Sequence, residues 1–145
     1  MLTGSTLVVV ADGAVGRFFR RAKSGAPLVE QTDLRMTVKP AEAERDRPPR
    51  VQDSFGSGRH AIERRLTAHE IAENKLLAQV AARTVAEIRS EKPECLALCA
   101  PPKALGVLRK LLASDLDQQL IVSLDKDITK ETSEEIDQRL KEHHA

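Results

Sequence analysis

Two short apolar runs constrain the fold of this chain more than any other feature. Residues 6–10 read TLVVV and residues 95–100 read CLALCA, so neither run alternates between apolar and polar side chains. A strand of this kind is buried on both faces, which requires a sheet covered by other elements on both sides. The two runs therefore predict central strands of a layered α/β domain.

Amphipathic segments predict the helices that cover this sheet. A capping box at Thr67-x-x-Glu70 predicts a helix that runs to about Glu91, and a second box at Thr132-x-x-Glu135 predicts the final helix. Leucines at helical spacing predict another helix after Pro101-Pro102. Residues 120–124 form a further apolar run, and this alternation of strands and helices predicts parallel pairing in the second half.

The first third of the chain predicts an antiparallel meander. Asp12-Gly13 and Ser24-Gly25 are turn signals on either side of a second strand over residues 15–22. Residues 28–38 predict a third strand, whose polarity suits the edge of a sheet or a strand covered on one side. The expected architecture is a mixed central β-sheet flanked by helices, with residues 1–145 forming a single domain.

Composition narrows the classes of function. The formal net charge is +1, so any attraction to nucleic acid must come from local clustering of charge. Phe18, Phe19 and Phe55 are the only aromatic residues, which counts against a face that stacks bases. Cys95 and Cys99 fall on one face of a predicted strand and read as small core residues rather than a disulfide or zinc pattern.

Targeting signals and membrane spans are not evident in the sequence. The apolar run at residues 7–11 is too short for a signal peptide and lacks a basic segment before it. No stretch approaches the roughly 18 apolar residues of a membrane span. We therefore expect a cytoplasmic location without membrane insertion, and no motif predicts a metal or another cofactor.

The segment from Val38 to Leu66 departs from the patterned remainder. The segment lacks a hydrophobic periodicity. Between Arg45 and Arg65 it contains six arginines and three acidic residues. Arginine forks bind phosphate with two hydrogen bonds, and long segments without secondary structure are usually functional or disordered. Two interpretations stay open: a loop that contacts RNA or another anionic partner, and a solvated linker whose charges maintain solubility.

Two further sets of charged residues can each be interpreted as structural or as functional. Arg17, Arg20, Arg21 and Lys23 could extend a basic patch, although charges on an edge strand that deter aggregation fit them better. Asp12 reads as a turn residue. It could instead hold metal ions of a hydrolase together with Asp125 or Asp127, if these carboxylates converge to within about 10 Å.

A set of motifs, in order along nearly the whole chain, resembles the bacterial family of proteins required for attachment to host cells. The stretches that carry the resemblance are Val9–Gly13 with Arg17 and Phe18, Asp46–Ser54, Ala100–Arg109 and Lys126–Thr129. That family is similar in fold to the middle domain of archaeal and eukaryotic translation release factors. In those factors the loop before the long helix carries Gly-Gly-Gln. Here Gly56-Ser57-Gly58 is followed by Arg59, so the release chemistry is not carried over and no catalytic residue is assigned.

The resemblance and the charge pattern together give a leading hypothesis. The chain is expected to be an RNA- or ribosome-associated domain, with tRNA or ribosomal RNA as partner and an indirect effect on host attachment. The alternatives are a protein-interaction module needed for attachment, and a metal-dependent hydrolase. The candidate binding residues are Arg45, Arg47, Arg50, Asp53, Ser54, Arg59, Arg64, Arg109 and Lys126.

Overall fold

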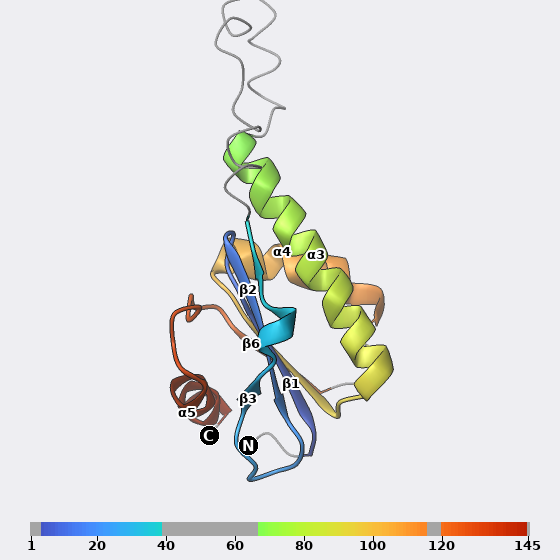
Figure 1. Cartoon of the computed structure of the whole chain (residues 1–145), viewed down its shortest axis with the longest axis vertical. Helices are drawn as coiled ribbons and strands as arrows, with labels where there is room; N and C mark the ends of the chain where they lie inside the picture. The colour runs from blue at the N-terminus through green and yellow to red at the C-terminus, as the bar shows by residue number, and fades with distance from the viewer. Residues whose placement is uncertain (1–3, 39–66, 116–119, 145) are drawn as a thin grey trace, which may run out of the picture.

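The computed structural model describes residues 4–38, 67–115 and 120–144 of the chain (Figure 1). Its elements are β1 (Thr6–Ala11), β2 (Val15–Arg21), β3 (Val29–Glu30), the 3₁₀ turn η1 (Thr32–Leu34), β4 (Met36–Thr37), α3 (Ala68–Glu91), β5 (Cys95–Cys99), α4 (Pro102–Leu112), the 3₁₀ turn η3 (Ala113–Asp115), β6 (Leu120–Leu124) and α5 (Ser133–His144).

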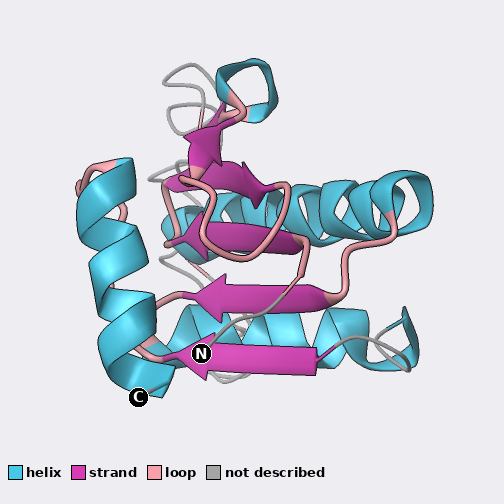
Figure 2. Cartoon of the chain, turned by 90° about the horizontal axis from the view of Figure 1, so that it is seen from below, coloured by secondary structure: helices cyan, strands magenta, loops and turns pink. Residues whose placement is uncertain are grey.

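The sheet is mixed, as the sequence predicted. Its strand order is β3-β2-β1-β5-β6, with β4 also paired to β2, and Figure 2 shows the strands side by side with the short ones at one end. β1 runs antiparallel to β2 and parallel to β5, and β5 runs parallel to β6. The hairpin signal at Asp12-Gly13 and the helical crossovers therefore produced the expected pairings.

The central strands β1 and β5 are buried along their whole length. One face packs Leu7, Val9 and Leu98 against the buried stripe of α3 and against α4. The other face packs Val8 and Phe19 against the buried residues of α5. Figure 1 shows α3 and α4 on one side of the sheet and α5 on the other. This two-sided covering is why the runs TLVVV and CLALC carry no polar alternation.

Both predicted capping boxes form at helix starts. Thr67 Oγ1 accepts the backbone N–H of Glu70 at 3.0 Å at the start of α3. The backbone N–H of Thr132 donates to Glu135 Oε1 at 2.9 Å before α5. α3 ends at Glu91, and its C-cap residue Lys92 has the left-handed conformation (φ 48°) and donates its N–H to the carbonyl of Ile88. The long helix thus begins and ends where the sequence predicted.

The single strand expected over residues 28–38 is wrong. Two two-residue strands, β3 and β4, replace it, and the turn η1 lies between them. β3 pairs with Phe19 and Arg20, whereas β4 pairs with Val15 and Gly16. Backbone hydrogen bonds from the N–H groups of Leu34 and Arg35 to the carbonyls of Gln31 and Thr32 close this turn, and alternation of polarity does not predict such bonds.

The two cysteines lie in the core, whereas one leucine of α4 does not. Cys95 and Cys99 are both buried and unpaired, in the core on the α5 face, as predicted. Leu111, one of the leucines at helical spacing in α4, is instead 47% exposed. In the described ranges, no helix is both long and apolar enough to cross a membrane.

Candidate functional site

The carboxyl ends of the parallel strands β1, β5 and β6 meet at one edge of the sheet, which we call the carboxyl edge. Asp12 follows β1, Ala100 follows β5 and Asp125 follows β6. The helices α3 and α4 begin at the same edge, where Lys103 Nζ lies 3.9 Å from Glu70 Oε2. In open α/β sheets this is the edge where ligands bind.

Asp12 closes the β1–β2 turn. Its Oδ1 accepts the backbone N–H groups of Ala14 and Val15 at 2.7 and 2.8 Å. Its own N–H donates to the carbonyl of Val15 at 3.0 Å. The interpretation of Asp12 as a turn residue is therefore confirmed.

Thr129 joins this turn to the loop after β6. Its Oγ1 lies 2.7 Å from Asp127 Oδ1 and 3.2 Å from Asp12 Oδ2. A hydroxyl has one proton, so it donates to one carboxylate at a time. Asp12 and Asp127 thus approach each other, as the hydrolase alternative required. Within the described residues, however, no group of three or more His, Cys, Asp or Glu could hold a metal.

Arg17 on β2 is the most heavily bonded side chain at this edge. Its Nη2 and Nε donate to the two oxygens of Glu30 at 2.7 and 3.0 Å. Its Nη1 donates to the backbone carbonyls of Thr129 and Glu131 at 2.8 and 2.7 Å. The guanidinium also lies over the ring of Phe19, 4.9 Å from the centroid. Arg17 therefore fastens the loop after β6 to the N-terminal meander.

The contact between Arg17 and Glu30 lowers the pKa of the Glu30 carboxyl. Arg17 is 7% exposed, so its charge is paired rather than solvated. The hydrogen bond from Arg17, aided by its positive charge, holds the pKa of the Glu30 carboxyl below its ordinary value. Burial opposes this shift, but the paired arginine outweighs it.

The earlier interpretation of Arg17, Arg20 and Arg21 as edge-strand charges is wrong. β2 lies inside the sheet, between β1 and the two short strands. Arg20 pairs with Glu87 on α3, and Arg21 pairs with Asp137 on α5. All three arginines thus bind acidic groups within the protein rather than extending a basic patch.

An open hollow of about 730 Å³ lies beside the Asp12–Thr129 contact. The side chains of Arg35 and Lys130 line it, and both residues are exposed. Arg17 lines it too, but four of its N–H groups already donate within the protein. Exposed cations are therefore the groups that this hollow offers to an anionic ligand.

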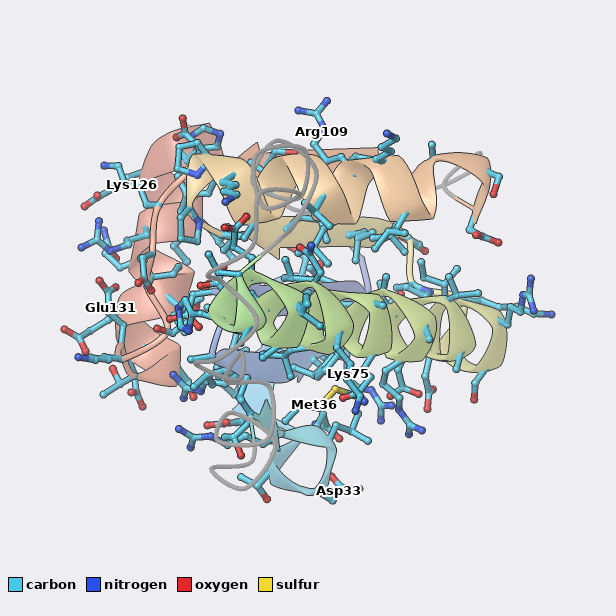
Figure 3. All side chains as sticks on the ribbon, turned by 90° about the horizontal axis from the view of Figure 1, so that it is seen from above. Asp33, Met36, Lys75, Arg109, Lys126 and Glu131 are labelled. Carbon is cyan, nitrogen blue, oxygen red and sulfur yellow. The ribbon has the colours of Figure 1, made fainter. Side chains whose placement is uncertain are left out.

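Two of the candidate binding residues fall within the described ranges, and they do not come together. Lys126 follows β6 and lines a smaller hollow of about 260 Å³ at the carboxyl edge. Arg109 is exposed on α4. Figure 3, which looks onto this edge, shows Lys126 beside α5 with Glu131, whereas Arg109 points outward from α4. Arg45, Arg47, Arg50, Asp53, Ser54, Arg59 and Arg64 lie outside the described residues.

Residues that flank the arginine-rich segment lie at the carboxyl edge. The N–H of Val38 donates to the carbonyl of Ala14 in the β1–β2 turn at 3.0 Å. On the other flank, Glu73 in the first turns of α3 lies so close to this turn that a Cβ on Gly13 would come 2.5 Å from the Glu73 side chain. Both flanks therefore meet at the turn that Asp12 closes.

The role of Arg17 could hardly be predicted from the sequence. Its partners Glu30, Thr129 and Glu131 are distant in sequence and carry no common spacing. The available signal was an arginine between apolar residues on an otherwise buried strand, which requires a paired charge.

Comparison with models of protein families gives a match over residues 7–140. The matching family is described as "Protein required for attachment to host cells". Comparison with curated proteins gave no match.

Proposed function

The chain belongs to the family of proteins required for attachment to host cells, and on that premise we propose that it is an RNA-binding domain. In this proposal the arginines between Val38 and Thr67 contact phosphates of tRNA or ribosomal RNA. The observation that carries the proposal is the position of the two flanks, since Val38 and α3 both adjoin the β1–β2 turn. The described residues on either side of the arginine-rich segment thus adjoin the edge at which open α/β sheets bind ligands.

The distribution of charge at the carboxyl edge supports an anionic partner. Arg35, Lys126 and Lys130 are exposed there. Two acidic groups at this edge, Asp12 and Asp127, accept backbone amides of the protein. The three exposed cations favour a ligand with negative charge.

Arginine chemistry points to phosphate as the group that is bound. Each guanidinium can donate two parallel hydrogen bonds to phosphate oxygens, which lysine cannot do. The proposed contacts are Arg45, Arg47, Arg50, Arg59 and Arg64, with Asp53 and Ser54, which lie between these arginines in the sequence, and Lys126 at the carboxyl edge. Arg109 lies on the outer side of α4 and would contact only an RNA that extends around this helix.

An effect on attachment would then be indirect. RNA binding can alter translation or regulation of other proteins that contact the host, which requires no contact between this chain and the host surface. The expected likeness to the middle domain of release factors remains a prediction, and the proposal assigns no hydrolytic step.

A salt titration tests the proposal. Fluorescence anisotropy of labelled tRNA and of a labelled ribosomal RNA fragment gives the Kd of the full chain at several salt concentrations. We expect log Kd to rise with log salt, with a slope of about 0.7 to 0.9 for each phosphate contact. Replacing Arg45, Arg47 and Arg50 by Gln should weaken binding and lower the slope by roughly 2.

The matched control removes three cations from the opposite edge. Lys23 follows β2, and Arg89 and Lys110 lie in the last turns of α3 and α4. Replacing these three by Gln leaves the same net charge as the test variant and should change the slope much less. Absence of binding at low salt, or equal losses in the two triple variants, would contradict the proposal.

A further inference from the structure

The two edges of the sheet are built differently. One edge consists of β3 and β4, strands of two residues each with the turn η1 between them. The other edge is β6, which is five residues long and pairs with β5 alone among the described strands. Figure 2 shows β6 at the end of the sheet opposite the short strands. Short, interrupted strands prevent an edge from pairing with another chain, whereas a longer edge strand permits such pairing.

The composition of β6 also suits pairing with another strand. Its sequence is LIVSL, so it contains no charged residue and no proline. Charges and proline are the other common means by which proteins prevent contact between sheet edges. Val122 and Leu124 are buried in the core on the α5 face, whereas Ile121 and Ser123 are only partly buried. The strand therefore has the composition of one inside a sheet, although it lies at the edge.

One hydrogen bond fixes which backbone groups of β6 face the open edge. The carbonyl of Leu124 accepts the N–H of Ala100, which follows β5, at 3.1 Å. The N–H and C=O groups of one residue in a strand point to the same side, and those of the next residue point to the other side. The backbone groups of Val122 and Leu124 therefore face β5, and those of Ile121 and Ser123 face away from it. The edge thus presents two N–H groups and two carbonyls that β5 does not bond.

We propose that a second copy of this chain pairs with β6, antiparallel to it, about a two-fold axis through Val122. Ile121 of each copy then lies opposite Ser123 of the other copy, and each such pair of residues exchanges two hydrogen bonds. Four bonds join the copies and use every outward backbone group of both strands. A second copy is the partner that this edge fits because Ile121 and Ser123 lie symmetrically about Val122. A pair of this kind is closed, as two-fold dimers are.

The side chains of β6 agree with an axis through Val122. The two copies of Val122 form a pair without hydrogen bonds, in which the Cα atoms lie about 4.5 Å apart. Val122 belongs to the apolar layer on the α5 face, so this layer continues from one copy to the other. On the opposite face Ile121 lies beside Ser123, and no charge is brought against a charge. A shift of the axis to Ser123 would instead place the exposed Asp125 opposite Ile121.

Sedimentation of the full chain tests the association. The average mass should rise from that of one chain toward twice that value as the concentration increases to about 1 mM, since an interface this small gives a weak complex. A mass of one chain at every concentration would overturn the proposal, and so would growth beyond two copies. No residue of β6 belongs to the candidate RNA-binding set, so this result is independent of the RNA titration.

Hydrogen exchange shows whether β6 forms the interface. The amides of Ile121 and Ser123 should exchange more slowly as the concentration rises, because the second copy bonds them. The amides of Val122 and Leu124 face β5, so they are the controls and should exchange slowly at every concentration. Exchange at Ile121 and Ser123 that is independent of concentration would contradict the proposal, whether the two copies associate elsewhere or another part of the chain covers this edge.

A substitution that removes one outward N–H group gives an independent test. Proline is accepted in edge strands where the N–H faces solvent, so Ser123→Pro should keep the fold, which circular dichroism measures. The pair loses two of its four bonds and should associate about tenfold more weakly or worse. Ser123→Ala keeps the N–H and is the matched control, with the affinity of the unchanged chain. Equal association of the two variants would show that β6 is not the interface.

A cysteine on the axis provides a test that leaves the backbone unchanged. Val122→Cys places the thiols of the two copies opposite each other, so mild oxidation should join the copies by a disulfide. The control is Ser114→Cys, which is exposed and follows the last residue of α4. An axis through Val122 places the two copies of residue 114 at opposite ends of the pair, so this variant should give far less linked product. Equal yields from the two variants would overturn the proposal.

Discussion

Gly16 of β2 lies directly against Val80 of α3: a Cβ on this glycine would come 2.6 Å from Val80 Cγ2. Val80 is fully buried, so it has no space into which to retreat. Gly16→Ala should therefore lower the free energy of unfolding by about 1–3 kcal/mol, the cost of overpacking a core. Urea denaturation of the two chains measures this difference.

The control for this prediction is Gly106→Ala. A Cβ on Gly106 would meet nothing within 4 Å, and the residue lies inside α4. Alanine is favoured over glycine in a helix, so this change should raise the free energy of unfolding by about 0.5–1 kcal/mol. Destabilisation by both changes would show that the contact with Val80 is not the cause.

Removal of the Arg17 guanidinium should be far more costly than removal of a surface charge. Arg17→Ala leaves the Glu30 carboxylate and two carbonyls without their donor, which should cost about 3–5 kcal/mol. Arg17→Lys should recover only part of this, because an ammonium cannot make the two-pronged contact. Denaturant unfolding gives both values.

The comparison for Arg17 is the exposed ion pair between Arg89 and Asp115. Its N–O distance is 3.4 Å, and the Arg89 side chain is 76% exposed. Arg89→Ala should cost no more than about 1 kcal/mol, the usual value for surface pairs. Similar losses for the Arg17 and Arg89 variants would contradict a structural role for the buried contact.

The free energy of unfolding should decrease at acidic pH, partly because Glu30 becomes protonated. Its pKa is lowered by the hydrogen bond from Arg17, so the unfolded chain takes up a proton at higher pH than the folded chain. The stabilisation is complete above the ordinary glutamate pKa of about 4.3 and is lost as the pH falls through the lower folded value. The Glu30→Gln variant should therefore have a lower free energy of unfolding than the unchanged chain at neutral pH. Between about pH 5 and pH 3 its free energy of unfolding should decrease less than that of the unchanged chain. Urea denaturation across this range measures both effects, and the same dependence in a chain with Arg17→Met would contradict the assignment.

The two thiols should be inert in the folded protein. Burial raises the pKa of Cys99 to about 12, and burial also raises the pKa of Cys95, although Arg21 opposes it. A disulfide reagent reacts with the thiolate, so neither residue should react at mildly alkaline pH until the protein unfolds. Absorbance of the released thiol measures the rate. Ser114→Cys, at an exposed position, should add one thiol that reacts in the folded state.

Most of the fold could be predicted from local patterns. The runs at Thr6–Ala11 and Cys95–Cys99 predicted central strands because only strands buried on both faces lack polar alternation. Thr67 marked the start of α3 because its hydroxyl bonds an amide three residues away. These signals depend only on residues that are close together in the chain, so a single sequence is enough to detect them.

The candidate site could be predicted much less well. Of the candidate binding residues, Lys126 lies after β6 and Arg109 lies on another side of the molecule, and the seven others fall outside the described ranges. Asp12 was correctly interpreted as a turn residue. Its contact with Thr129 joins groups 117 residues apart, which spacing cannot reveal.

The sequence by itself determined which segments form strands and helices and which faces of them are apolar, because periodicity and capping act over a few residues. Only the tertiary structure decided what the charged residues do. Arg17, Arg20 and Arg21 were interpreted from the sequence as charges on an edge strand, yet each binds an acid brought to it by a different part of the chain. The physical reason is that a buried charge must be paired, and the choice of partner depends on how elements pack rather than on their order.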